Sequence, residues 1–129
     1  MDNKTKQELG AIGEKLAVDY LKKHGYRIVE QNYRTKLGEI DIIAQEGSYL
    51  CFVEVKTRKN ASKGWPEEAI GREKIRKISQ NALCYLKQKN ISGDKMRFDV
   101  VAVVVSEVFI AARISLIKDA FELAVPYFT

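Results

Sequence analysis

The spacing of apolar residues predicts a helix and then a strand in the first quarter of the chain. Apolar side chains recur every three or four positions over residues 7–23, which predicts an amphipathic helix with one buried face. Gly25 closes this pattern, and glycine commonly follows the last helical turn. Gly10 and Gly13 lie near the apolar stripe, so we expect another backbone to approach the helix closely there. A weak alternation over residues 26–33 predicts the first strand.

Two β-rich runs, residues 39–44 and 49–57, flank a short polar break and predict a β-hairpin. We expect Glu46 and Gly47 to form the turn, because glycine supplies the positive φ of tight turns. Since side chains alternate along a strand, this hairpin gathers its charged residues on one face. The register puts Asp41 opposite Phe52 and Glu39 opposite Glu54, the charged face carries Glu39, Asp41, Glu54 and Lys56, and the opposite, buried face carries Ile40, Ile42, Val53 and Val55.

The second half of the chain predicts one long helix, two strands and a short final helix. Apolar spacing over residues 67–89 is helical, whereas residues 97–105 are apolar at almost every position, which is typical of a strand buried on both faces. Residues 108–114 predict another strand, and Ser115 is expected to cap a helix over residues 116–123. The resulting order, α-β-β-β-α-β-β-α, predicts an α/β sandwich of three layers with a mixed central sheet.

Composition is that of a globular protein without a membrane span. The 129 residues, 46% hydrophobic and 30% charged, suffice for a single domain over residues 1–129. The longest apolar run, residues 100–105, is too short to cross a bilayer, and no signal peptide opens the sequence. Cys51 and Cys84 lack metal or disulfide spacing, so we expect a reducing, cytoplasmic location and no membrane partner. The formal charge of +5 suits a polyanionic partner, and the sequence does not decide between a monomer and a homodimer.

The predicted charged face brings carboxylates together at a cost in free energy. Two carboxylates about 5 Å apart repel by roughly 3 kcal/mol at an effective dielectric constant of about 20. A divalent cation between Asp41 and Glu54 would turn this repulsion into attraction, and oxygen ligands favour Mg²⁺ or Mn²⁺. Glu14 lies at the edge of the first helix's apolar stripe and could reach the same face. The alternative is a solvated strand face on which Glu54 pairs with Lys56.

Cations crowd the first turns of the second predicted helix, at Arg72, Lys74, Arg76 and Lys77. Positive charge opposes the helix dipole at that end, so phosphate binding is one reason for their presence and a solvated basic face is the other. A basic loop over residues 59–66 precedes this helix. Its Trp65 either packs on the edge of the core or offers a stacking surface to a base.

The charged residues of the hairpin resemble a known catalytic motif. Asp41 followed by Glu54-Val55-Lys56 resembles the Asp…Glu-x-Lys core of the PD-(D/E)XK nuclease superfamily, although Ile40 replaces the proline that usually precedes the aspartate. The wider pattern, over most of the chain, resembles the YraN-like family of uncharacterised bacterial proteins. Its elements here are Gly10-Ala-Ile-Gly-Glu14, Asn32-Tyr-Arg34, Gly38-Glu-Ile-Asp41, Phe52-Val-Glu-Val-Lys-Thr-Arg58 and Arg97-Phe-Asp-Val100.

These resemblances imply a restriction-endonuclease-like core, similar to archaeal Holliday-junction resolvases, and a Mg²⁺- or Mn²⁺-dependent endonuclease that hydrolyses phosphodiester bonds in DNA, including branched or structured DNA. The residues implied to hold the metal are Asp41, Glu54, Glu14, Glu39 and the carbonyl group of Val55. Lys56 would orient the attacking water and stabilise the transition state, and Lys74 matches an assisting residue on the following helix. The expected nucleic-acid contacts are Arg58, Arg72, Lys74 and Lys77.

The sequence leaves two other functions open. A nucleic-acid-binding module would keep the fold and the metal but cut nothing, and a structural adaptor would use the acidic face to bind a basic protein. Cleavage that EDTA abolishes separates the nuclease from the module, and salt-dependent DNA binding separates the module from the adaptor. His24, the single histidine, excludes a histidine base combined with histidine metal ligands, and the sequence has no glycine-rich phosphate loop.

Overall fold

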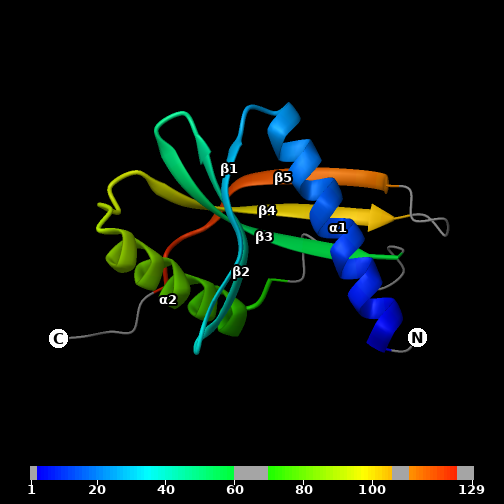
Figure 1. The fold of residues 1–129 in the computed structure, drawn as a ribbon, viewed down its shortest axis with the longest axis horizontal. Coiled ribbons are helices and arrows are strands. Elements are labelled where there is room, and N and C mark those ends of the chain that lie inside the picture. The colour runs from blue at the N-terminus through cyan, green and yellow to red at the C-terminus, as the bar shows by residue number, and fades with distance from the viewer. Residues whose placement is uncertain (1–2, 60–69, 106–110, 125–129) are drawn as a thin grey trace.

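A computed structural model of the chain describes residues 3–59, 70–105 and 111–124. Two helices cover the two faces of a five-stranded sheet whose strands run in the order β1-β2-β3-β4-β5 (Figure 1). The elements are α1 (Asn3–Lys23), β1 (Arg27–Thr35), β2 (Gly38–Glu46), β3 (Tyr49–Arg58), α2 (Arg72–Lys89), β4 (Met96–Val105) and β5 (Ala111–Phe121). Only β3 and β4 pair in parallel, across the connection that contains α2, and the other neighbours are antiparallel. The predicted mixed sheet in an α/β fold is therefore confirmed.

Each helix buries its apolar stripe in a separate core. Ala17 and Leu21 of α1 pack with one cluster, the α1 core, that includes residues of β2, β3 and β4. Ile78 and Tyr85 of α2 pack with a second cluster, the α2 core, on the other side of the sheet. Strand β4 contributes Phe98 to the second cluster and three valines to the first, so the prediction of a strand buried on both faces is confirmed.

The β2–β3 hairpin forms, but its register differs from the predicted one. Glu46 pairs with Tyr49, so Gly47 and Ser48 form the turn, and Gly47 has the expected positive φ of 57°. Phe52 consequently lies opposite Ile43 rather than Asp41. Moving the turn by one residue changes each cross-strand partner by two positions, which conserves the direction of the side chains.

The prediction that the hairpin has one charged and one apolar face is wrong. Ile40 packs in the α2 core, whereas Ile42 packs in the α1 core. Between them, at Asp41, β2 leaves β3: the paired residues end at Ile42 and Val53, while β2 continues to pair with β1 as far as Gly38. Helix α1 covers one face of the hairpin and α2 covers the other, so the charged side chains cluster where the two strands separate.

The C-terminal helix predicted over residues 116–123 is absent. Strand β5 occupies this region, and Ser115, the expected helix cap, pairs with Ala102 of β4. Ile114 and Leu116 pack against the α1 core on the same side of the strand. The gain from covering the apolar β4 strand therefore outweighs the local helical pattern, and the order of described elements is α-β-β-β-α-β-β.

Helix boundaries also differ from the prediction. Helix α1 begins at Asn3 rather than at residue 7, and α2 begins at Arg72. The predicted first turn of α2 at residues 67–69 lies outside the described residues, as do Trp65 with most of its loop and the predicted start of the last strand at residue 108. Neither described helix is long and apolar enough to cross a membrane.

Candidate functional site

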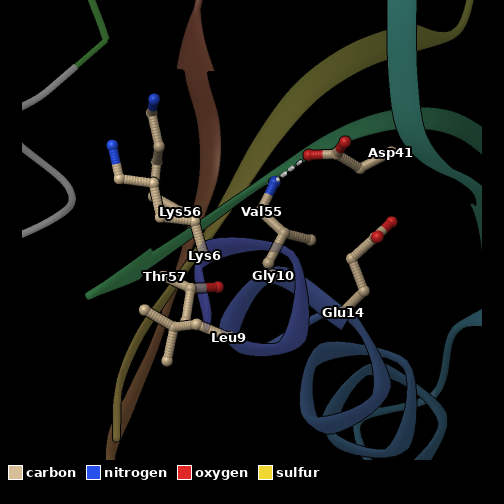
Figure 2. A pocket seen from close by; sticks show the side chains of 8 residues that line it. All are labelled: Lys6, Leu9, Gly10, Glu14, Asp41, Val55, Lys56 and Thr57. Atoms are coloured by element: carbon tan, nitrogen blue, oxygen red, sulfur yellow. Dashed lines mark hydrogen bonds between the residues drawn. The ribbon is translucent and has the colours of Figure 1, made fainter. Parts of the chain in front are cut away.

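Asp41 lies at the point where β2 separates from β3. Its Oδ2 atom accepts a hydrogen bond from the backbone N–H of Val55 at 2.8 Å (Figure 2). The side chain of Asp41 thus satisfies a backbone donor beyond the last paired residues, Ile42 and Val53. This bond fixes the carboxylate at the edge of the gap between the two strands.

Three carboxylates from two elements meet at this gap. Glu14 of α1 and Glu39 and Asp41 of β2 each offer an oxygen atom within 4.8 Å of the others. The structure therefore brings Glu14 of α1 to the hairpin, one of the two positions that its place on the helix allowed. We call these three residues the carboxylate cluster. Each is partly buried, and oxygen ligands at this spacing match the preference of Mg²⁺ and Mn²⁺.

Glu54 lies next to the carboxylate cluster and pairs with a lysine from the other side of the sheet. Its side chain is only 4% exposed, and Oε2 lies 3.1 Å from Nζ of Lys74 on α2. The Glu54 carboxyl group is also close enough to Asp41 to raise the pKa of that residue. Asp41 therefore connects the carboxylate cluster to the Glu54–Lys74 pair. The predicted alternative, in which Glu54 pairs with Lys56, is wrong because Lys74 occupies the position beside Glu54.

Crowding of the carboxyl groups favours their protonated forms. Burial, followed by the hydrogen bond and the negative charge of Glu54, raises the pKa of Asp41 to about 8. Burial also raises the pKa of Glu14, and the charges of Asp41 and Glu39 add to this effect. Partial burial acts to lower the pKa of Lys74, but the interaction with Glu54 and the charges of Asp41 and Glu39 together outweigh it, so the pKa of this lysine is raised. A cation would favour the ionised carboxylates again.

An open pocket of about 330 Å³ extends from the carboxylate cluster along α1 and β3. Its lining residues are Lys6, Leu9, Gly10, Glu14, Asp41, Val55, Lys56 and Thr57 (Figure 2). The side chains of Lys6 and Lys56 point the same way, toward the end of the pocket opposite the carboxylates of Glu14 and Asp41. The pocket thus has an acidic end and a basic end, and neither lysine has an ion-pair partner within the part of the chain that the structure describes.

Two glycines allow α1 to form one wall of this pocket. A Cβ atom on Gly13 would lie 1.9 Å from Oγ1 of Thr57, so only glycine permits this approach between α1 and β3. The expected close approach is therefore present at Gly13, although the neighbour is the side chain of Thr57 rather than a backbone. A Cβ atom on Gly10 would meet nothing within 4 Å, because Gly10 faces the open pocket.

A buried asparagine supports the turn that leads into the acidic strand. Asn81 of α2 is fully buried, and its Oδ1 accepts a hydrogen bond from Oγ1 of Thr35. A Cβ atom on Gly38 would lie 3.2 Å from Nδ2 of Asn81, and Gly38 has a φ of 140°. The chain turns at Gly38, and this turn packs against α2 immediately before Glu39.

The remaining predicted cations lie outside the carboxylate cluster. Arg76 binds both oxygens of Glu73 on its own helix at 2.8 Å. Arg58, Arg72 and Lys77 form no ion pair with the cluster among residues 3–59, 70–105 and 111–124. Their contact with nucleic acid remains a prediction, and Lys74 is the one cation of α2 seen at the site.

Asn32 and Lys6 also belong to the site, although the sequence pattern did not predict this. Asn32 of β1 donates hydrogen bonds to Glu14 and Glu39, and its place in the Asn-Tyr-Arg motif was the available signal. Lys6 lies four residues before Gly10 and eight before Glu14, a spacing that places all three on one side of α1.

Comparison with known proteins identifies the family of the chain. The family model described as "Uncharacterised protein family UPF0102" matches residues 13–103, which include every carboxylate discussed above. A UPF0102 protein of Syntrophus aciditrophicus is 50% identical over 115 residues, covering 89% of each chain. A UPF0102 protein of Geotalea daltonii is 49% identical over 123 residues, covering 95% of this chain and 94% of its own. The chain therefore belongs to the uncharacterised protein family UPF0102, in agreement with its YraN-like motifs.

Proposed function

We propose that this protein is a Mg²⁺- or Mn²⁺-dependent nuclease of the PD-(D/E)XK type that hydrolyses phosphodiester bonds in DNA. The position of Asp41 carries the proposal, because this residue joins the carboxylate cluster to Glu54 at the mouth of a pocket that also contains Lys56. The mixed sheet with a helix on each face supports a restriction-endonuclease-like core. The resemblance of Asp41, Glu54 and Lys56 to the superfamily motif adds to this support.

The donor atoms fit a hard divalent cation. Glu14, Glu39 and Asp41 bring three carboxylates within 4.8 Å, and Glu54 adds a fourth beside Asp41. No cysteine or histidine belongs to this group, so the donors favour Mg²⁺ or Mn²⁺ over zinc or copper. Mg²⁺ normally retains several waters and takes phosphate oxygens from its substrate, which an open pocket allows.

The side chains of the site have separable roles in this proposal. When bound, the metal would activate a water molecule and neutralise charge on the phosphate. The hydrogen bond from Val55 N–H fixes Asp41, and Lys74 holds Glu54 at the buried end of the site. Lys56 has a long side chain in the same pocket and no ion-pair partner among the described residues. Its ammonium group would stabilise the extra negative charge of the transition state. Lys6, on the α1 side of the pocket, would bind another phosphate of the same nucleic-acid strand.

A non-catalytic nucleic-acid-binding module is the second candidate. The observation in its favour is that the Lys56 ammonium lies toward the end of the pocket away from Asp41 and Glu14. In that arrangement Lys56 and Lys6 would bind phosphate without acting on a bond near the carboxylates. The two candidates differ in whether nucleic acid is cut when a divalent cation is added.

A panel of labelled substrates tests the proposal. Duplex, forked, four-way-junction and single-stranded DNA, with RNA as a comparison, are incubated with Mg²⁺, Mn²⁺ or EDTA. We expect cleavage of at least one DNA with Mg²⁺ or Mn²⁺, none with EDTA, and none by Asp41→Asn, which retains an acceptor for the Val55 N–H. Binding of DNA without cleavage under every condition would favour the module, and equal cleavage by Asp41→Asn would exclude this site.

A further inference from the structure

We infer that Asn32 is a positioning residue that holds Glu14 and Glu39 together for a divalent cation, an inference that rests on the proposed metal site. Asn32 belongs to β1, a strand that contributes no residue to the carboxylate cluster. Its side-chain amide nevertheless connects the two elements that do, α1 and β2. We therefore assign it a role in arranging the ligands rather than in binding the metal itself.

The hydrogen bonds of Asn32 use both hydrogens of its amide group. Nδ2 donates to Oε1 of Glu14 at 2.9 Å and to Oε1 of Glu39 at 2.7 Å. Since the two acceptors come from residues 18 and 7 positions away, no local turn explains the pair of bonds. Arg34 donates from Nε to the other oxygen of Glu39 at 3.0 Å and fixes the orientation of that carboxylate. Oε2 of Glu14 has no hydrogen-bond partner among the described residues and remains available for a cation.

The backbone of Asn32 adopts a conformation that directs this side chain. Its φ is 53°, in the left-handed region, although it lies within a strand. This conformation costs free energy for residues with a Cβ atom, and asparagine is one of the few that tolerate it. The next residue, Tyr33, is buried in the α2 core, and its hydroxyl donates to Gln88 at 2.7 Å. The strand is thus held on one side by packing while Asn32 turns its amide toward the carboxylates.

In the metal-free protein the Asn32 amide holds the carboxylates of Glu14 and Glu39 together, as a bound cation would. Glu14, Glu39 and Asp41 repel one another, and the side chains of Glu14 and Glu39 are partly exposed, so repulsion favours their separation. The two donated hydrogen bonds oppose this separation and keep the ligand oxygens within 4.8 Å. Residues that orient metal ligands from the outer shell typically change metal affinity by about 10- to 100-fold when they are replaced.

Asn32→Gly removes the side-chain amide of Asn32 and leaves its backbone conformation accessible. Glycine adopts the left-handed conformation freely, so this variant removes the two hydrogen bonds without straining the strand. Asn90 provides a matched control, because it has almost the same φ, 55°, and lies at the end of α2. Mn²⁺ affinity is measured by titration calorimetry on the full chain, with melting temperature in EDTA and in saturating Mn²⁺. We expect Asn32→Gly to weaken Mn²⁺ binding about 10- to 100-fold and Asn90→Gly to change it less than about twofold.

A double-mutant cycle identifies the route of the effect. If Asn32 acts by holding two carboxylates together, its replacement should have little further effect on Mn²⁺ affinity in a Glu39→Gln background. Wild-type affinity in Asn32→Gly would overturn the inference while leaving the metal site intact. A wild-type protein that binds no Mn²⁺ would overturn the metal site and the inference with it. An Asn32→Gly protein that does not fold in EDTA would make Asn32 a structural residue and would also overturn the inference.

Discussion

The ammonium group of Lys74 lies 3.1 Å from the buried carboxylate of Glu54, so a residue of α2 rather than the neighbouring Lys56 balances this charge. The pairing frees Lys56 for the pocket on the α1 side of the site. It also ties the first turns of α2 to the centre of β3. The two motif lysines thus have different surroundings, and their replacement should have different consequences.

Replacement of Lys74 should affect stability and metal binding together. Lys74→Met retains the aliphatic part of the side chain but leaves the Glu54 carboxylate buried without its partner. Loss of one partner from a fully buried ion pair typically costs about 3–5 kcal/mol of unfolding free energy. The cost should be smaller here because Lys74 is half exposed. Saturating Mn²⁺ should recover part of this loss, because the cation supplies positive charge near Glu54. Denaturant unfolding with and without Mn²⁺ measures both effects. Lys77→Met, on the same helix, is the control and should leave stability within about 0.5 kcal/mol.

The raised pKa of Asp41 predicts a pH-dependent stability. In the folded protein the carboxyl group of Asp41 retains its proton up to about pH 8, whereas an unfolded aspartate releases its proton near pH 4. This contribution to stability is present at low pH and is lost as the pH rises from about 4 through 8, at up to about 1.4 kcal/mol per pH unit. Asp41→Asn should flatten this decline and raise the melting temperature at pH 8 in EDTA. Parallel stability profiles for the two proteins would contradict the prediction.

Replacement of Lys56 should reduce the rate of cleavage more than it reduces binding. If its ammonium group acts on the transition state, Lys56→Ala should lower single-turnover cleavage about 10²- to 10³-fold while Mn²⁺ affinity stays level or rises slightly. The fold should tolerate the change, because Lys56 has no ion-pair partner within the described ranges. Single-turnover kinetics and the melting temperature are measured side by side. A stable Lys56→Ala protein that cuts at the wild-type rate would exclude the catalytic role.

We predict that the Arg97-Phe-Asp-Val motif stabilises the fold and does not take part in metal binding. Asp99 is fully buried and accepts hydrogen bonds from Tyr26 at 2.7 Å, Arg97 at 3.0 Å and the N–H of Asp119 at 2.9 Å. Asp99→Ala removes the acceptor of the buried Tyr26 hydroxyl and of Nε of Arg97, whose side chain is 13% exposed, and should cost about 3–5 kcal/mol of unfolding free energy. The exposed Asp94 gives the control, Asp94→Ala. Denaturant unfolding measures the loss, and Mn²⁺ affinity per folded molecule should remain at the wild-type value.

Two alanine substitutions in α1 should change stability in opposite directions. Gly13→Ala places a Cβ atom 1.9 Å from Oγ1 of Thr57, so α1 must move away from β3 at a cost of about 1–3 kcal/mol. Gly10→Ala meets no atom within 4 Å and should stabilise the helix by up to about 1 kcal/mol. Thermal unfolding of the two variants, which differ only in position, is the measurement. Equal melting temperatures would show that α1 does not approach β3 as closely as the structure has it.

Elements with strong local signals could be predicted from the sequence. The apolar period of α1, the glycine turn between β2 and β3, and the continuous apolar run of β4 each specify an element without reference to the rest of the chain. The types of the site residues were also readable, because Asp41, Glu54 and Lys56 stand at the spacing of a recognisable motif. Glu14 could be placed because its position on a regular helix fixes its direction.

The partners of these residues depend on how the whole chain folds. Strand β5 replaces the predicted final helix because pairing with the apolar β4 buries more apolar surface than an isolated short helix could. The local sequence pattern gives no information about this long-range pairing. The separation of β2 from β3 depends on where the turn falls and on the bond between Asp41 and Val55. Lys74 and Asn32 reach the carboxylates from elements 20 residues after Glu54 and 18 after Glu14. Such contacts depend on how two helices pack against the sheet, which is a property of the whole core rather than of any one segment.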